Sequence, residues 1–258
     1  MKILMILGFL FLNIAAPVLS EASRPTGPKH VAIVIDDFGN DMKGTNEILS
    51  LPIRLTVAVM PFLSTTKKDA ELAHQKGHEV ILHLPMEPVH GKKSWLGPGA
   101  ITSDLSDKEV RERVIKAIED VPHAVGMNNH MGSKITADSR IMRIILEVCQ
   151  EKGLYYLDSK TTGKSVVEKL ASELGVPYLE NELFFDEQYT TSHIVRQANL
   201  LLNRIENDTE IIAIGHVGIA GDKTASVLKQ YVPKVKEKAK AVTLSELFLH
   251  PEDVTNFQ

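Results

Sequence analysis

Residues 30–39 read His-Val-Ala-Ile-Val-Ile-Asp-Asp-Phe-Gly, an apolar run that leads into two adjacent carboxylates. Such a run is typical of a strand buried on both faces, as in a parallel sheet covered by helices. The aspartates then fall at the carboxyl end of the strand, where α/β proteins place their chemistry. Adjacent carboxylates indicate a metal site or, more simply, a helix cap beside a solvated aspartate. Because neighbouring strand residues point to opposite faces, the two share a pocket only if the strand bends, which Gly39 allows.

Apolar strands and amphipathic helices alternate along the rest of the chain. Further strands are expected at 53–59, 79–83, 124–127, 154–157, 176–179, 210–215 and 241–243. Helices are expected between them at 45–51, 64–76, 106–120, 138–152, 165–174, 191–206 and 225–238. Seven or eight strand–helix units without a break in composition predict one α/β domain that forms a closed or nearly closed (β/α) barrel. A doubly wound open sheet is the alternative.

The two ends of the chain differ in character from this domain. Residues 1–22 carry one lysine, an apolar run at 3–12 broken only by Gly8, and small residues suited to cleavage, which predicts a signal peptide. An uncleaved membrane anchor is the alternative. Residues 23–29 are expected to be a linker, 30–250 the domain and 251–258 a tail. The sequence therefore predicts an exported protein that is secreted, wall-associated or periplasmic.

Charge and cysteine content narrow the possible functions. The formal net charge is −4 and no basic stripe with interleaved aromatic residues is present, which argues against a nucleic-acid binder. Contact with a membrane is expected only through an uncleaved signal segment. Cys149 is the single cysteine and lies in a helical apolar pattern, so we expect a buried thiol and no intramolecular disulfide.

Potential metal ligands follow the expected strands. His83, His130, Asp158 and His216 each come directly after an apolar run, or within three residues of one, as the aspartate pair does. In a barrel the carboxyl ends of all strands surround one opening, so these side chains are expected to converge. The alternative for each histidine is a core side chain bonded to a backbone carbonyl.

A catalytic zinc usually has three protein ligands and one open position for water. Asp37, His83 and His130 supply such a set, so a divalent metal, most suitably zinc, is the expected cofactor. Asp36 is then expected to be the general base that acts on the activated water, and His216 the acid that protonates the leaving group.

Four further residues are candidates for contacts with substrate or with the ligands. Asp158 is expected to orient a ring nitrogen. Glu87, four residues after His83, is a fourth ligand, a substrate contact or a loop residue, and a substrate contact or a support for the ligands is favoured. Asn128 and Asn129 either bind sugar hydroxyls or an amide, or satisfy buried backbone groups at the end of a strand.

Together these motifs resemble the divergent polysaccharide deacetylase family, over residues 29–248. The resemblance is carried by Ile35-Asp36-Asp37-Phe38-Gly39, His83-Leu84-Pro85-Met86-Glu87-Pro88, Gly126-Met127-Asn128-Asn129-His130-Met131-Gly132-Ser133, Leu157-Asp158-Ser159 and Ile214-Gly215-His216. The Asn-Asn-His-Met-Gly-Ser run is the most specific of these. The family is similar to the NodB-type carbohydrate esterases, which implies a distorted (β/α) barrel and a zinc-dependent removal of acetyl groups from N-acetylated polysaccharides.

By this resemblance Asp36 matches the base, Asp37 and His83 match metal ligands, and His216 matches the acid. The better-known enzymes take a second histidine ligand from a His-Ser/Thr-x-x-x-His pattern; here Glu87 stands at that position, so His130 is expected to be the third ligand. Their Arg-x-Pro motif and acetyl-pocket tryptophan have no counterpart. A metal-bearing protein that binds glycans without turnover, and a metal-free glycoside hydrolase that uses Asp36 with Glu87 or Asp158, are therefore the alternatives.

Overall fold

A computed structural model of the chain describes residues 27–248. The expected signal peptide, most of the expected linker and the expected tail lie outside these residues. Within them, no helix combines the length and the apolar character that crossing a membrane requires.

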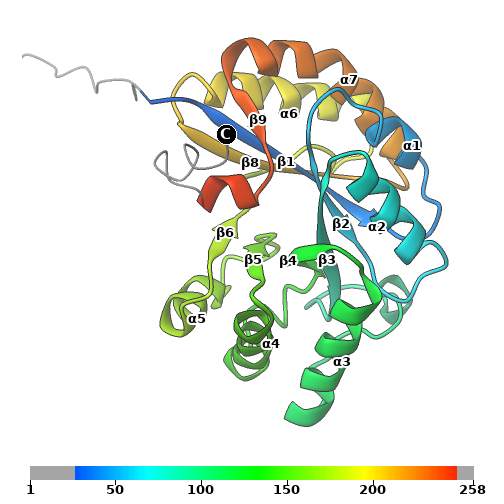
Figure 1. Cartoon of the computed structure of the whole chain (residues 1–258), viewed down its shortest axis with the longest axis vertical. Coiled ribbons are helices and arrows are strands. Elements are labelled where there is room, and N and C mark those ends of the chain that lie inside the picture. Colours follow the sequence, from blue (N-terminus) through cyan, green and yellow to red (C-terminus); the bar gives the residue numbers. More distant parts are fainter. Residues whose placement is uncertain (1–26, 249–258) are drawn as a thin grey trace, which may run out of the picture.

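The core of the fold is one parallel sheet that curls into a distorted (β/α) barrel (Figure 1). Along the sheet the strands follow the order β6-β5-β4-β3-β2-β1-β8-β7, and β9 pairs with β1. Their bounds are β1 (His30–Phe38), β2 (Thr56–Val59), β3 (Glu79–Met86), β4 (Ala124–Met131), β5 (Tyr155–Asp158), β6 (Tyr178–Glu180), β7 (Leu183–Phe184), β8 (Glu210–His216) and β9 (Lys240–Val242). The predicted distorted (β/α) barrel is confirmed, and the alternative of a doubly wound open sheet is wrong.

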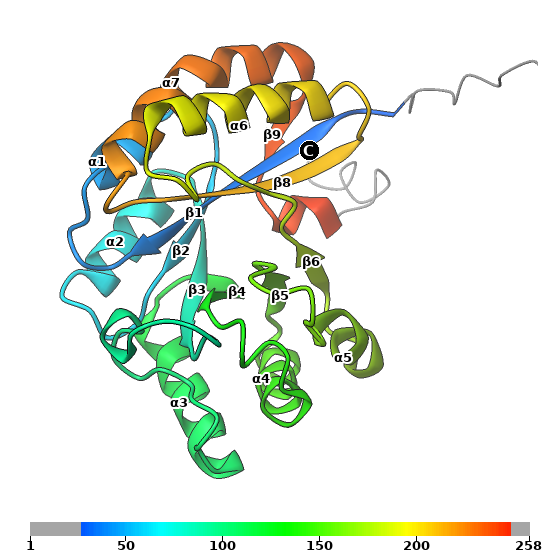
Figure 2. The same ribbon diagram turned by 180° about the vertical axis from the view of Figure 1, so that it is seen from behind.

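Helices cover the outer face of the curled sheet, as Figures 1 and 2 show from opposite sides. They are α1 (Thr45–Ile48), α2 (Thr66–Gln75), α3 (Asp107–Asp120), α4 (Ser139–Lys152), α5 (Val167–Leu174), α6 (Thr191–Arg204) and α7 (Gly221–Lys238), with short 3₁₀ turns η1 (Lys93–Trp95) and η2 (Ser245–Phe248). Local signals begin several of them: Ser106 and Glu109 form a capping box before α3, and Asp138 caps α4. Cys149 of α4 is buried, as expected.

Residues of β1 alternate strictly between two apolar layers. Val31, Ile33 and Ile35 pack outward in the layer shared with the helices, whereas Ala32 and Val34 pack inside the barrel. Both faces of the strand are therefore buried, which explains its unbroken apolar run. The same alternation sets which side chains at the strand ends reach the barrel interior.

The two edge strands of the sheet, β6 and β7, are joined by only two residues. Asn181 N donates to Asp158 O of β5 at 2.9 Å, and Glu182 N donates to Ile212 O of β8 at 3.2 Å. The chain thus passes from one edge of the sheet to the other and brings β7 and β8 opposite β4 and β5. At the amino end of the barrel, Glu79 of β3 accepts hydrogen bonds from Tyr155 Oη at 2.7 Å and from Ser245 N of η2 at 3.2 Å. These bonds connect β3, β5 and η2 at this end of the barrel.

Candidate metal and catalytic site

The site begins where β1 departs from regular strand geometry. The pairing of β1 with β2 shifts register between Ile35 and Phe38, and Asp37 has a φ of 71°. Asp36 follows the alternation of Ala32 and Val34 into the barrel, and the bulge turns Asp37 toward the same opening instead of outward. The bend that two aspartates in one pocket require therefore occurs at Asp37 itself. Gly39 N then donates to Asp69 Oδ2 at 2.9 Å, which fixes the loop that follows.

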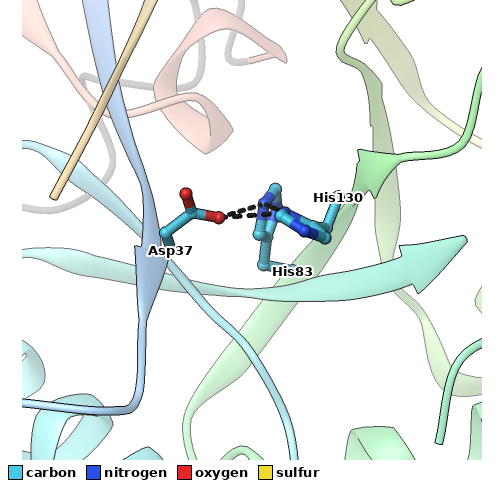
Figure 3. A group of neighbouring side chains, drawn as sticks. All are labelled: Asp37, His83 and His130. Atoms are coloured by element: carbon cyan, nitrogen blue, oxygen red, sulfur yellow. Dashed lines mark hydrogen bonds and ion pairs between the residues drawn. The ribbon is translucent and has the colours of Figure 1, made fainter. Parts of the chain in front are cut away.

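Asp37, His83 and His130 converge on one point (Figure 3). Asp37 Oδ1 lies 2.9 Å from His130 Nδ1 and 3.3 Å from His83 Nε2, and the two ring nitrogens are 3.2 Å apart. Although Asp37 Oδ1 is buried, it has no hydrogen-bond partner among the described residues. One carboxylate oxygen and two imidazole nitrogens that face a common point fit a divalent metal ion, and the donor set suits zinc.

Each imidazole has a partner for the nitrogen that faces away from this point. His83 Nδ1 lies 2.7 Å from Asn128 Oδ1, and His130 Nε2 lies 3.1 Å from the backbone oxygen of Trp95. Both partners are acceptors, so the hydrogen of each ring is on the outer nitrogen. This fixes the tautomers that leave His83 Nε2 and His130 Nδ1 free to bind a metal.

The charges of the cluster reinforce one another. Burial alone would raise the pKa of Asp37, but the facing imidazoles of His130 and His83 hold this pKa well below its ordinary value. Burial alone would lower the pKa of His83, but the carboxylates of Asp36 and Asp37 raise it. In the absence of a metal, the buried carboxylates thus favour protonated His83, and a divalent cation would replace that positive charge.

Asp36 lies beside the cluster without being part of it. Its side chain is 2% exposed, and Asn128 Nδ2 donates to Oδ1 and Oδ2 at 3.0 and 3.2 Å. Burial raises the pKa of Asp36, against the opposing charges of His83 and His216. A buried carboxylate with a raised pKa, next to a group of potential metal ligands, has the properties of a general base.

His216 stands at the end of β8, directly across the pairing from Asp36 of β1. Its Nδ1 lies 2.7 Å from Asp186 Oδ1, while Asp186 Oδ2 accepts from His216 N at 2.9 Å and from Thr224 Oγ1 at 2.7 Å. Burial would lower the pKa of His216, but the hydrogen bond to Asp186 and the charges of Asp37 and Asp36 raise it to about 10. The ring is therefore protonated at neutral pH and suited to act as an acid.

Asp186 is the important residue that the sequence did not reveal. It follows β7, which has only two residues and was not expected as a strand. The sequence instead suggested Asp158 as the carboxylate that orients a ring nitrogen, whereas in the structure Asp186 is the carboxylate beside His216. Asp158 lies in outward alternation with Tyr156 of β5, and its Oδ1 accepts from Lys160 N at 2.8 Å.

A pocket of about 610 Å³ opens over these side chains. The residues that line it are Asp36, Asp37, His83, Trp95, Asn129, His130, Met131, Ser159, Thr161, Phe184, Asp186, Glu187, Tyr189, His216, Val217, Ile219 and Ala220. Glu87 and Asp158 are not among them, so a metal-free glycoside hydrolase that pairs one of these carboxylates with Asp36 is not supported. The pocket is the one place within residues 27–248 where the expected base, acid and metal ligands meet.

The remaining candidates organise the loops around the pocket. Glu87 accepts from Lys134 Nζ and from Ser103 N, each at 2.8 Å, and so braces two loops instead of facing the pocket. Asn129 lines the pocket, but its side chain also accepts from Ser159 N at 3.1 Å and donates to Met131 O at 2.8 Å. Of the two asparagines, Asn128 thus contacts His83 and Asp36, and Asn129 satisfies backbone groups at the strand ends.

A family model described as divergent polysaccharide deacetylase matches residues 33–248. The chain belongs to the divergent polysaccharide deacetylase family. One relative is the uncharacterized protein YibQ of Escherichia coli strain K12. It is 34% identical over 239 residues, which cover 93% of this chain and 73% of that protein.

Solved structures support the fold of this family member. The uncharacterized protein ATU2773 from Agrobacterium tumefaciens C58 superposes with a TM-score of 0.78 at 20% identity, covering 87% of this chain and 92% of the other. The Bc1960 peptidoglycan N-acetylglucosamine deacetylase superposes with a TM-score of 0.54 at 16% identity, covering 87% and 90%. The divergent polysaccharide deacetylase family thus shares its curled barrel with a carbohydrate deacetylase.

Proposed function

We propose that this chain is a divalent-metal-dependent hydrolase that removes N-acyl groups, acetyl above all, from sugars of a cell-envelope polysaccharide. Membership in a family described as divergent polysaccharide deacetylase supports the reaction class, and the fold shared with a peptidoglycan N-acetylglucosamine deacetylase supports the substrate class. The observation that carries the proposal is the meeting of Asp36 and His216 with the Asp37–His83–His130 cluster in one pocket. Export of the protein, expected from residues 1–22, belongs to the same proposal.

The metal would be held by Asp37 Oδ1, His83 Nε2 and His130 Nδ1. Bound there, a divalent ion supplies a Lewis acid for the acyl carbonyl and lowers the pKa of a water molecule. Zinc is the ion we favour, because one carboxylate and two imidazoles are a common donor set for it.

Asp36 receives the proton of the attacking water on its carboxylate. The amide of Asn128 holds this carboxylate in place, and burial raises its pKa, so Asp36 is a stronger base than an exposed aspartate. His216 gives a proton to the departing sugar nitrogen. Its Nδ1 is engaged with Asp186, so the proton comes from Nε2, and the carboxylate of Asp186 stabilises the charged ring.

The direct test is release of acyl groups by the zinc-loaded full chain. Acetate release is measured from N-acetylglucosamine oligomers and from peptidoglycan glycan strands. We expect Asp36→Asn and His216→Ala each to lower the rate by about 10²–10⁴-fold, the usual contribution of a general acid or base. Asp41→Asn is the matched control. Asp41 is exposed, lies four residues after Asp37 and does not line the pocket. Its φ of 49° is one that asparagine tolerates.

If no N-acylated glycan loses its acyl group, the proposed reaction is wrong. Glycan binding without acyl release, unchanged by Asp36→Asn, would identify the protein as a glycan-binding relative that has lost turnover. A zinc-independent rate would contradict the role given to Asp37, His83 and His130.

A further inference from the structure

Two large aromatic side chains line the pocket and yet remain more than half exposed. Trp95 is 57% exposed and Tyr189 is 54% exposed. Of the seven large hydrophobic residues that are exposed within residues 27–248, these two and Ile219, at 77%, all line this one pocket. Single exposed apolar residues are ordinary, but a concentration around one opening indicates a surface that binds a ligand.

The two aromatic residues belong to loops that reach the pocket from different strands. Trp95 belongs to η1, in the loop between β3 and α3, and its backbone oxygen accepts from the metal-ligand candidate His130. Tyr189 lies between β7 and α6, three residues after Asp186, which holds His216. Lys223 Nζ donates to the backbone oxygen of Tyr189 at 2.8 Å and fixes this loop. The loop of Trp95 thus borders the metal-ligand candidates, and the loop of Tyr189 borders the candidate acid.

The chemistry of these positions suits sugar rings. A pyranose in its chair form presents a flat face of C–H groups that packs on an aromatic ring, while its hydroxyl groups stay in water at the rim. Exposed rings at the rim of a pocket allow this contact without requiring the whole sugar to be desolvated. Lys92 Nζ lies 5.6 Å from the centroid of the Trp95 indole, a cation–π contact that helps to hold the ring at the rim.

We infer that Trp95 and Tyr189 hold the sugar units on either side of the unit whose acyl group is removed, so the substrate is an internal sugar of a chain of N-acylated sugars. This inference rests on the proposed function, because it places the reacting sugar between the metal ligands and His216. It adds that at least three consecutive sugars are needed for full affinity. A single N-acylated sugar held by its acyl group lacks the two neighbouring sugars that these rings would hold.

A substitution at Trp95 can test sugar binding separately from metal binding. Its backbone oxygen supports His130, whereas its side chain lines the pocket, and Trp95→Ala removes only the side chain. We therefore expect Trp95→Ala to weaken glycan binding and leave zinc affinity unchanged. Because Trp95 is the single tryptophan of the chain, tryptophan fluorescence of the other variants reports on this position alone.

The experiment uses the zinc-loaded full chain with Asp36→Asn, so that bound glycan is not turned over. N-acetylglucosamine oligomers of one to six units are titrated and followed by Trp95 fluorescence and by calorimetry. Affinity is expected to rise about tenfold for each aromatic position that becomes occupied and to stop rising beyond the trimer. Adding Tyr189→Ala or Trp95→Ala should each remove about tenfold of the affinity for the trimer without changing that for the monomer.

Matched variants test whether the aromatic ring is the cause. Tyr189→Phe should keep the affinity for the trimer, and Leu200→Ala, at an exposed apolar residue of α6 away from the pocket, should not change it. Equal affinity for monomer and hexamer, no binding of any oligomer, or a Tyr189→Ala variant that binds the trimer normally would overturn the inference. Length-dependent binding without acyl release by the unmodified chain would retain the two sugar positions and reject only the proposed hydrolysis.

Discussion

The side-chain oxygen of Asn128 lies 2.7 Å from Nδ1 of His83. The same asparagine donates through its amide nitrogen to the carboxylate of Asp36. One fully buried side chain therefore sets both the tautomer of a metal-ligand candidate and the position of the candidate base. In this barrel the candidate metal site and the candidate base are therefore not independent, and we expect a change at Asn128 to affect both.

Replacing Asn128 in two ways separates its two contacts. Asn128→Ala removes the acceptor for His83 and the donor to Asp36, and we expect zinc affinity to fall by about 10–100-fold, the usual effect of losing a partner behind a ligand. Asn128→Asp keeps an acceptor for His83 but places a second carboxylate against Asp36. This variant should retain most of the zinc affinity and still lose deacylation.

Chelator competition measures zinc affinity in both variants, and circular dichroism checks the fold. Equal zinc affinity in Asn128→Ala and in the unmodified protein would show that His83 does not depend on this contact. Equal losses in Asn128→Ala and Asn128→Asp would show that the carboxyl acceptor does not replace the amide.

Metal binding at Asp37 should be visible as thermal stability. A ligand at 100 times its Kd stabilises the folded state by about 2.7 kcal/mol, which for a chain of this size raises Tm by roughly 5–10 °C. We expect zinc to produce such a rise and a chelator to reverse it. Asp37→Asn removes the charge but keeps the shape, and asparagine tolerates the φ of 71°, so the variant should fold and show no rise. A full zinc-dependent rise in Asp37→Asn, measured by calorimetry, would contradict the site.

The alternation of side chains along the strands explains which site residues the sequence revealed. Asp36, His83 and His216 share the inward alternation of their strands, so each was found from its place after an apolar run. Asp158 follows an equally clear run but lies in the outward alternation, and Ser159 reaches the pocket instead. Tyr155 and Leu157 pack inside the barrel, so Asp158, the next residue, faces outward. The sequence alone does not show which of the two alternating sets of β5 faces inward.

Other parts of the site had no sequence signal. Asp186 follows a strand of two residues, too short to give an apolar pattern. The acceptor for His130 is the backbone oxygen of Trp95, which any residue type would supply. Local signals such as the capping box at Ser106 revealed the helices that they begin. β3 runs three residues further than expected and β4 runs four residues further, and the added end of β4 gave no strand signal because it is polar.

The contact between His216 and Asp186 predicts the alkaline side of the pH–rate profile. His216 acts as an acid only while protonated, and its pKa of about 10 keeps it protonated at neutral pH. The rate should therefore fall as the pH rises through the pKa of His216. Asp186→Asn removes a negative charge that raises this pKa, so the decline should move to lower pH. NMR titration of the His216 ring checks the assignment, with Asp41→Asn, which lies outside the pocket, as the control. An alkaline limb that does not move in Asp186→Asn would argue that another group sets it.

A contact between two loops predicts the consequence of adding one methyl group. Gly221, the first residue of α7, approaches Lys43 so closely that a Cβ atom would lie 2.0 Å from Lys43 O. Helix propensity alone favours Gly221→Ala by up to about 1 kcal/mol, but a clash with backbone costs about 3 kcal/mol or more, so the clash decides the sign. Because the two loops follow β1 and β8, the strands of Asp36 and His216, deacylation should fall as well.

Gly163→Ala is the matched control, since no atom lies within 4 Å of the added Cβ, and its free energy of unfolding should change by less than about 0.5 kcal/mol. Urea unfolding of both variants measures the difference, and a Gly221→Ala protein as stable as Gly163→Ala would show that the loops are not packed this closely.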